Sequence, residues 1–339
     1  MDKRISKFNN GGILLVSIVV IIFSGCRMCG YDYYTYLDHF NSLPDLYAYK
    51  RQESTFEVGY EYVVSAFKTF SNNFNLFLFF YALVTILMVI FLSKKYSPLP
   101  LLSVVLFCGP FLFGQIMGQM RQPLANCLLY MCIIPFLLRN KKWSVFFISL
   151  FIGFCLHKSI ILIAIFLPFM GKVYSKKQLK QFGLISIGCF ILSSVVHNYI
   201  LNIIPNSFLL AKTAINYLNS NVSFNLGMLE RIVLFVVVLF YSCKYRLYAE
   251  NKVFRIFLNL YGLGMLLYIS LIHVSSEFAV RGTNGLYFSI IFILPYLIKK
   301  AIGRDKSILI VGSILWCSYL LVSFVLRLPN EYYPYQSII

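Results

Sequence analysis

Three side chains with a clear chemical use stand at the predicted ends of apolar helices in this 339-residue chain. They are Arg121, in Gln-Met-Arg-Gln-Pro; His157, in Leu-His-Lys-Ser; and Arg281, directly before Gly-Thr-Asn. A guanidinium offers a planar fork of N–H donors that suits phosphate oxygens, and an imidazole can accept a proton or donate to a phosphate. The residue types therefore indicate binding of a phosphorylated ligand together with proton transfer.

Each of these residues also has a purely structural interpretation. Arg121 could anchor its helix at the membrane surface, because long basic side chains reach from apolar helices toward the headgroups. His157 could be a packing residue where two helices meet. Arg281 follows Glu277 by four residues, which is the spacing of an ion pair within one helix. The local patterns leave both interpretations open.

The sequence carries no signature of a metal or nucleotide site. Its four histidines, at positions 39, 157, 197 and 273, include no pair at helical i,i+4 spacing. It has no glycine-rich phosphate loop and no soluble nucleotide-binding unit. Among nine cysteines, Cys26 and Cys29 have C-x-x-C spacing but no further ligands nearby. We therefore expect no metal and no cofactor, and a donor substrate that is already in the membrane.

The elements that must position these residues are membrane helices. Hydrophobic residues make up 59% of the chain and charged residues 12%, with a mean hydropathy of +0.76. A bilayer core of about 30 Å needs roughly 20 helical residues, and many apolar blocks approach that length. We predict an all-α, polytopic helical bundle forming a single integral membrane domain over residues 1–339. About eleven transmembrane helices are expected, at roughly 11–27, 74–93, 98–118, 121–138, 143–157, 158–172, 182–204, 226–243, 254–273, 283–298 and 307–326.

The charged residues give these spans an orientation. Most of the 30 basic residues fall in stretches that would lie on one side of the membrane, starting with Lys3, Arg4 and Lys7. Cytoplasmic loops are enriched in lysine and arginine, so we predict a cytoplasmic N-terminus on an uncleaved first helix. Most acidic residues fall on the other side. The net charge of +18 then reflects membrane orientation, and no nucleic-acid partner is expected.

Two outer loops and one helix junction follow from this topology. The longer loop, about 28–73, contains a helical apolar pattern over Val58 to Phe70 that is typical of a helix lying on the membrane. A second loop, about 205–225, is rich in Asn and Ser. The spans 143–157 and 158–172 reach only about 22 Å each, so His157 and Lys158 could lie below the outer surface, with a re-entrant hairpin as the alternative.

The order of short motifs along the chain resembles the EpsG-like group of Wzy-type O-antigen and exopolysaccharide polymerases. The resemblance runs from about Tyr31 to the C-terminus, and Pro123 departs from its pattern, although the first turn of a helix accepts proline. The motifs are Tyr31-Asp32-Tyr33-Tyr34, Glu57-x-Gly59-Tyr60, Arg121-Gln122-x-x-Ala125, His157-Lys158-Ser159, Arg281 before an apolar span, and Tyr333-Pro334-Tyr335-Gln336-Ser337.

The resemblance implies a GT-C-like membrane glycosyltransferase of the bacterial inner membrane. Such a polymerase takes a glycan from undecaprenyl diphosphate and transfers it to another lipid-linked repeat unit at the periplasmic face. Its expected partners are the undecaprenyl-diphosphate-linked oligosaccharide and the lipid bilayer. The resemblance leaves open whether a chain-length regulator protein is also a partner.

The resemblance also implies roles for individual residues. Arg121 and Arg281 would hold the departing diphosphate, where cations stabilise developing charge. His157, Glu57 and Asp32, in that order, are the candidate bases for the acceptor hydroxyl. The expected substrate contacts that complete the set are Gln122, Lys158 and Tyr60.

Three other functions compete with polymerisation. A flippase for the same lipid-linked glycan usually has two repeated halves and ionisable residues in the middle of its spans, and the sequence shows neither. An O-antigen ligase is favoured by a long outer loop late in the chain, whereas the longest loop here is early. A membrane O-acyltransferase is similar in size, but the first helix lacks a His/Arg pairing suggestive of that group.

Overall fold

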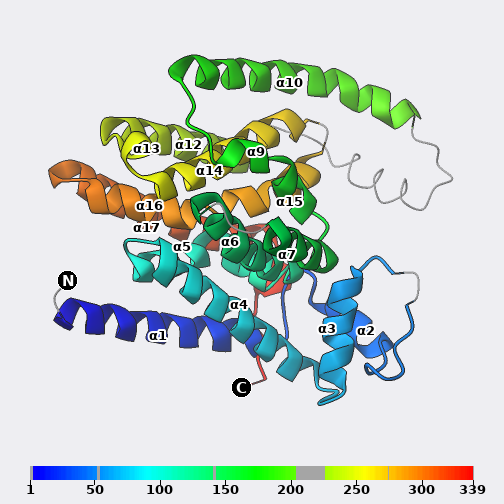
Figure 1. Ribbon diagram of the computed structural model, residues 1–339. Helices are drawn as coiled ribbons and strands as arrows, with labels where there is room; N and C mark the ends of the chain where they lie inside the picture. Colours follow the sequence, from blue (N-terminus) through cyan, green and yellow to red (C-terminus); the bar gives the residue numbers. More distant parts are fainter. Residues whose placement is uncertain (1–2, 52–53, 140–142, 204–225, 274, 339) are drawn as a thin grey trace. The chain divides into compact units, whose positions relative to one another are not determined.

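The computed structural model describes residues 3–51, 54–139, 143–203, 226–273 and 275–338 (Figure 1). These residues form α-helices joined by short connections, with a single isolated β-bridge between Arg27 and Ser337. The predicted all-α class is confirmed. The predicted second outer loop, about 205–225, lies outside the described residues.

The described helices agree with a multi-pass membrane protein. Five are long and apolar enough to cross a bilayer, and three shorter apolar helices accompany them. The five are Phe74–Tyr96, Arg121–Leu138, Leu226–Lys244, Lys252–Leu271 and Gly303–Arg327. The shorter three are Asn9–Gly25, Pro100–Ile116 and Trp143–Leu156.

Contacts within the chain define two compact units inside the region predicted as one domain. The first unit comprises residues 1–160 and 294–339, and the second comprises residues 161–293. Each unit is described by itself below.

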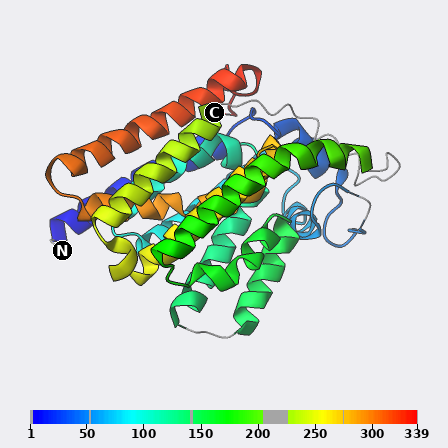
Figure 2. The ribbon, with the colours of Figure 1, turned by 90° about the horizontal axis from the view of Figure 1, so that it is seen from above.

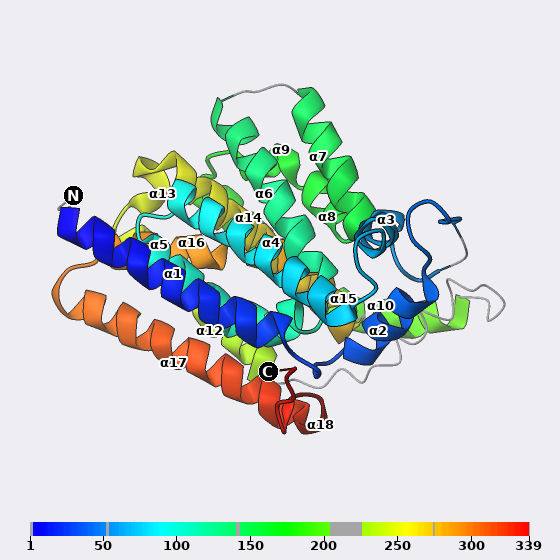
Figure 3. The same ribbon diagram turned by 90° about the horizontal axis from the view of Figure 1, so that it is seen from below.

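The first unit is built around α1 (Lys3–Gly25) and α4 (Phe74–Tyr96), which pack against each other (Figure 3). Helix α5 (Pro100–Phe111) packs against both, and α17 (Gly303–Arg327) packs against α5. Asn73 starts α4 by accepting a hydrogen bond from the Leu76 N–H at 3.0 Å. The outward face of α4 is as apolar as its buried face, with Leu76, Phe80, Leu87 and Phe91 exposed, as expected where lipid is the solvent.

The second pair of helices in this unit carries the predicted site motifs. Helix α5 is followed directly by one π-helical turn, η1 (Leu112–Ile116). A turn over residues 117–120 then leads into α6, which starts at Arg121. Helix α6 (Arg121–Arg139) packs against α7 (Trp143–Leu156), which in turn contacts α3 (Val58–Lys68). A Cβ at Gly59 would lie 2.8 Å from the Cys155 carbonyl oxygen, so only glycine permits this approach of α3 to α7.

The outer segment between α1 and α4 holds two helices. Helix α3 confirms the helix predicted from Val58 onward, while α2 (Tyr33–Ser42) was not indicated by the sequence pattern. Lys68 near the end of α3 ties the two together by donating to the Phe40 carbonyl oxygen at 3.0 Å and to that of Leu43. The segment is therefore ordered by polar contacts as well as by apolar packing.

In the second unit, α14 (Lys252–Leu271) packs against α10 (Lys176–Ile203), α12 (Leu226–Lys244) and α15 (Ser276–Tyr287). Figure 2 shows the long α10 lying over α14. Three further short helices are α13 (Leu247–Glu250) in the second unit, α16 (Ile290–Lys300), whose residues divide between the two units, and α18 (Pro329–Tyr332) in the first unit.

Two predicted spans are wrong as single helices. The span 283–298 divides between α15 (Ser276–Tyr287) and α16 (Ile290–Lys300), with a turn at residues 288–289. Residues 158–172 form α8 (Ile160–Ile165) and α9 (Leu167–Met170), each too short to cross a bilayer. Pro168 has no N–H to bond the preceding turn, and its ring clashes with a continuing helix, so the helix breaks before it. Two short helices agree better with the re-entrant hairpin, which the sequence left open as the alternative, than with a helix that spans the membrane.

Candidate active site

The first unit brings together two predicted site residues that lie 64 positions apart. Glu57 immediately precedes α3, and Arg121 is the first residue of α6. The Nη1 of Arg121 donates to Oε2 of Glu57, and both side chains are largely buried, at 19% and 9% exposed. Burying two charges is costly unless each is paired and hydrogen-bonded, so this ion pair must be held in a defined geometry.

Aromatic rings and a phenol provide that geometry. The Arg121 guanidinium lies 4.5 Å from the Phe56 ring centroid and 5.7 Å from those of Tyr36 and Tyr60. Its Nε also donates to the Tyr36 hydroxyl at 3.2 Å. Cation–π contacts and the planar donor fork together restrict the guanidinium far more than a lysine would be restricted. Tyr60 was a predicted site residue, whereas Tyr36 and Phe56 were not.

The connection after α7 completes this site. The backbone N–H of Lys158 donates to Oε1 of Glu57 at 3.2 Å, so each carboxylate oxygen has a donor. Gln122 Nε2 donates to Ser159 Oγ at 3.1 Å, and Ser159 Oγ lies 2.8 Å from Nδ1 of His157. The predicted residues therefore form two hydrogen-bonded sets, Arg121–Glu57–Lys158 and Gln122–Ser159–His157, which adjoin because Arg121 precedes Gln122 and Lys158 lies between His157 and Ser159.

The hydrogen bonds at His157 indicate which ring nitrogen carries the proton. The Ser159 N–H points to Nδ1 at 3.3 Å, so Nδ1 acts as an acceptor. In a neutral imidazole the other nitrogen, Nε2, then holds the proton. The half-buried ring would offer an N–H donor at Nε2, which suits a phosphate or sugar oxygen better than it suits proton abstraction.

Two buried phenols stand beside Arg121 with no hydrogen-bond partner among the described residues. They belong to Tyr60 on α3 and Tyr81 on α4, which are 0% and 3% exposed. Their ring centroids are 6.2 Å apart. Burial raises the pKa of Tyr60 well above its usual value, so its hydroxyl stays protonated. Buried hydroxyls normally find hydrogen-bond partners, so these two phenols are available to a polar group that enters the site.

A second carboxylate, which the sequence pattern did not single out, organises the outer segment next to this site. Glu61 on α3 is 1% exposed, accepts from the Tyr49 hydroxyl at 2.6 Å and pairs with Arg51. Burial alone would raise the pKa of Glu61, but these hydrogen bonds outweigh burial and lower it. The His39 ring stacks on Phe56 at 3.7 Å, and its Nε2 lies 3.9 Å from Glu61. Phe56 thus contacts both His39 and Arg121.

This arrangement predicts a pH dependence of stability. Burial lowers the pKa of His39 from 6.5 to about 4, so between these values the unfolded chain binds more protons than the folded chain. The free energy of unfolding should therefore fall as the pH drops from 7 to 5. Thermal unfolding of purified protein measures the fall. His39→Phe keeps a ring stacked on Phe56 but cannot titrate, and its midpoint should change less over this range. An equal change in both proteins would contradict the assignment.

The remaining predicted residues are Asp32, in the first unit, and Arg281, in the second. Asp32 occupies the position before α2, and its carbonyl oxygen accepts from the Tyr36 N–H at 3.0 Å, so it starts the helix that carries Tyr36. Arg281 lies on α15 in the second unit and is half-buried. The side chain of Glu277, its expected partner, lies outside the described residues.

The second unit has a polar cluster that the motifs did not indicate. The guanidinium of Arg231, on α12, lies 4.7 Å from the Tyr268 ring and 4.5 Å from the Tyr287 ring. It donates to Thr283 and Asn284 on α15, at 3.3 Å each. These contacts attach α12 to the part of α15 that directly follows Arg281.

Comparison with known proteins identifies the family. The family model described as the EpsG family matches residues 13–337, nearly the whole chain. Comparisons with curated proteins and with solved structures find no match. The matched range contains the Glu57–Arg121 pair, the His157 connection and the C-terminal tail. The chain therefore belongs to the EpsG family, a family of Wzy-like polymerases.

Proposed function

We propose that this chain is a membrane glycosyltransferase that polymerises lipid-linked glycan repeat units. It would transfer a glycan from undecaprenyl diphosphate to another lipid-linked repeat unit at the periplasmic face of the inner membrane. The observation that carries the proposal is the buried Glu57–Arg121 ion pair, joined through the Lys158 N–H to the His157 connection. Family membership supports a polymerase-type role in general.

The proposed reaction uses groups that this site provides. A sugar hydroxyl of the acceptor loses its proton to a carboxylate oxygen of Glu57, and the hydroxyl oxygen forms a bond to the anomeric carbon of the donor glycan. The bond from that carbon to the diphosphate oxygen breaks, and polyprenyl diphosphate leaves with the electron pair. Donors at the leaving group stabilise the charge that develops there.

The hydrogen bonds favour Glu57 over His157 as the base. Both oxygens of Glu57 are oriented by fixed donors, and each retains a lone pair for a further proton. With Nδ1 accepting from Ser159, His157 is proposed as a hydrogen-bond donor to the substrate. Asp32 is retained as a proposed base of lower rank. Arg281 is proposed as a diphosphate ligand on its residue type and motif alone.

The first unit also supports the proposed orientation. Helix α6 starts at the site with Arg121, and α4 starts at Phe74, whose ring packs against Phe40 of α2. Both helices end in basic residues, Lys94 and Lys95 on α4 and Arg139 on α6. The C-terminal tail returns to the end of α1, where the Met28 N–H donates to the Gln336 carbonyl oxygen at 2.8 Å. With basic ends in the cytoplasm, the site and the tail would both face the periplasm.

Surface polysaccharide from a strain that lacks this gene tests the function. A polymerase deletion should leave single repeat units on the lipid carrier or core, because units are still made and moved across the membrane. A flippase deletion would leave none, and an acyltransferase deletion would leave a complete ladder. Gel analysis of the polysaccharide, with the intact gene restored on a plasmid as control, separates these outcomes, and a complete ladder would end the proposal.

Substitutions at His157 separate a donor role from a base role. Gln can donate a hydrogen bond but cannot usefully accept a proton, whereas Leu can do neither. We expect His157→Gln to retain a shortened but visible ladder and His157→Leu to lose it, with both proteins at normal membrane levels. Complete loss in a well-expressed His157→Gln protein would instead assign the base role to His157.

A further inference from the structure

Arg27 is a fully buried cation in the first unit, 1% exposed, and it takes part in none of the ion pairs among the described residues. Its guanidinium donates to four backbone carbonyl oxygens instead. Nε donates to Ser24 at 3.0 Å, Nη1 to Cys29 at 3.0 Å and to Met117, and Nη2 to Ile116 at 3.5 Å. A buried charge without such partners would be strongly destabilising.

These carbonyl groups lie at the ends of two separate helical segments. Ser24 is in the last turn of α1, while Ile116 ends η1 and Met117 follows it. Carbonyl oxygens at a helix C-terminus carry a partial negative charge, so one cation between two such ends stabilises both. Arg27 thereby holds the end of α1 against the end of η1, although nearly ninety residues separate them.

The glycine that follows makes this approach possible. Gly30 has a φ of +128°, and a Cβ there would press on the Arg27 guanidinium and lie 2.6 Å from the Met117 carbonyl oxygen. The C-terminal tail also fixes the backbone around Arg27. The Ile338 N–H donates to the Cys26 carbonyl oxygen at 3.0 Å, and the Tyr332 hydroxyl donates to that of Phe113 in η1 at 2.9 Å.

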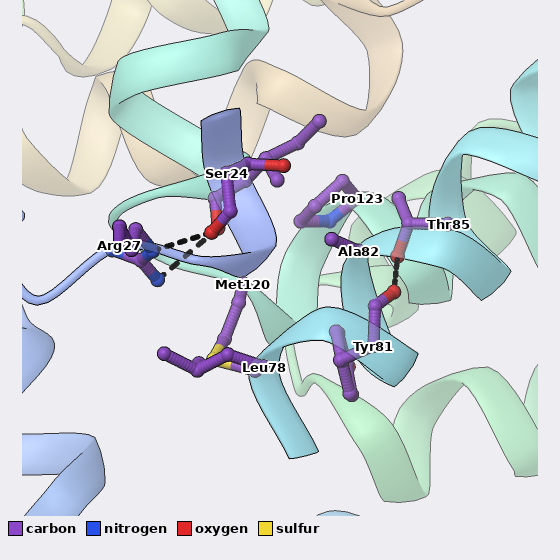
Figure 4. Close-up of a pocket in the computed structure, with 9 residues that line it drawn as sticks. Ser24, Arg27, Leu78, Tyr81, Ala82, Thr85, Met120 and Pro123 are labelled. Atoms are coloured by element: carbon purple, nitrogen blue, oxygen red, sulfur yellow. Dashed lines mark hydrogen bonds between the residues drawn. The ribbon is translucent and has the colours of Figure 1, made fainter. Parts of the chain in front are cut away.

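Arg27 and the start of α6 line the same small cavity (Figure 4). The cavity has a volume of about 10 Å³, about the smallest that holds one water molecule. Met120 and Pro123, on either side of Arg121 in the sequence, form part of the wall, as does Tyr81. Only residues 118–120 separate the Met117 carbonyl, which Arg27 holds, from Arg121 itself.

We propose that Arg27 is a positioning residue that sets the location of Arg121, by holding the carbonyl groups of Ile116 and Met117 from which the turn into α6 starts. The inference rests on the proposed role of Arg121 at the reaction centre. Arg27 itself touches no reacting atom. A lysine at position 27 would keep the charge but lose the planar fork that reaches both helix ends.

A double-substitution cycle tests this assignment. Initial rates are measured with purified protein in nanodiscs, using undecaprenyl-diphosphate-linked repeat units extracted from the deletion strain. We expect Arg27→Lys to lower kcat about tenfold or more with little change in KM, because small misplacements of reacting groups are costly. In an Arg121→Lys background the same change should lower kcat less than about twofold, since residues that act through one another are not additive. Equal fold-changes in both backgrounds would overturn the proposal.

Further variants keep the test decisive. Ser24→Ala removes a hydroxyl from the same cavity wall but leaves the Ser24 carbonyl that Arg27 binds, so its kcat should match the unchanged protein. If Arg121→Lys is too slow to measure, Tyr36→Phe supplies the second background, because it removes the hydroxyl that the Arg121 Nε contacts. A normal rate for Arg121→Lys alone would show that the proposed role of Arg121 fails, independently of Arg27→Lys.

Discussion

Glu57→Gln is expected to abolish the polymer while the protein remains folded in the membrane. Gln keeps the size of the side chain, and its single carbonyl oxygen can still accept the hydrogen bond that Arg121 donates, although its NH₂ group cannot accept the second bond from the Lys158 N–H. It cannot take up the proton of an acceptor hydroxyl. Loss of a general base typically costs about 10² to 10⁴ in rate, enough to remove a visible ladder. Gel analysis of polysaccharide from the complemented deletion strain, with membrane protein levels measured in parallel, gives the result.

Glu57→Asp is the matched control for this prediction. It retains the carboxylate but withdraws it by one methylene group, so a weakened ladder should persist. A normal ladder from Glu57→Gln would exclude Glu57 as the base and direct attention to Asp32. Loss of protein from the membrane in both variants would mean that the ion pair is needed for folding, since breaking a buried pair can cost about 3–5 kcal/mol. The polymerisation rates of purified Glu57→Gln and Glu57→Asp in nanodiscs would then be compared at equal amounts of folded protein.

Arg121→Lys is the second change with a large expected effect. Lysine keeps the positive charge but cannot contact the Glu57 carboxylate and the Tyr36 hydroxyl with one planar group. It also loses the stacking over Phe56 at 4.5 Å. We expect the polymerisation rate to fall by about 10² or more, similar to the loss of a preorganised donor at a reaction centre.

A conservative change at the opposite end of the same helix controls for Arg121→Lys. Arg139 ends α6, where we expect it only to fix the cytoplasmic end of the span. Arg139→Lys should therefore give a normal ladder at a normal protein level. If Arg121→Lys and Arg139→Lys behave alike, Arg121 serves as a membrane anchor and the proposed reaction centre is wrong.

The locations of most helices followed from the sequence because a membrane span is a local property. The apolar blocks at 74–93 and 307–326 correspond to α4 (Phe74–Tyr96) and α17 (Gly303–Arg327). Their lengths and flanking basic residues are read directly along the chain, since the bilayer requires about 20 apolar residues whatever their neighbours are. The amphipathic pattern likewise predicted α3. Pro168 shows the limit, because one residue converted an apolar block into two short helices.

The pairing of the site residues was decided by tertiary structure. Glu57, Arg121 and His157 each had the right residue type, but no periodicity relates a residue before α3 to the first residue of α6. Their contacts depend on how closely α3 approaches α7, which Gly59 permits, and on where the turn after η1 delivers Arg121. Arg27 went unnoticed for the same reason: its partners are backbone carbonyl groups, and any sequence supplies those. Only the packing of two helix ends around one guanidinium gives this arginine its role.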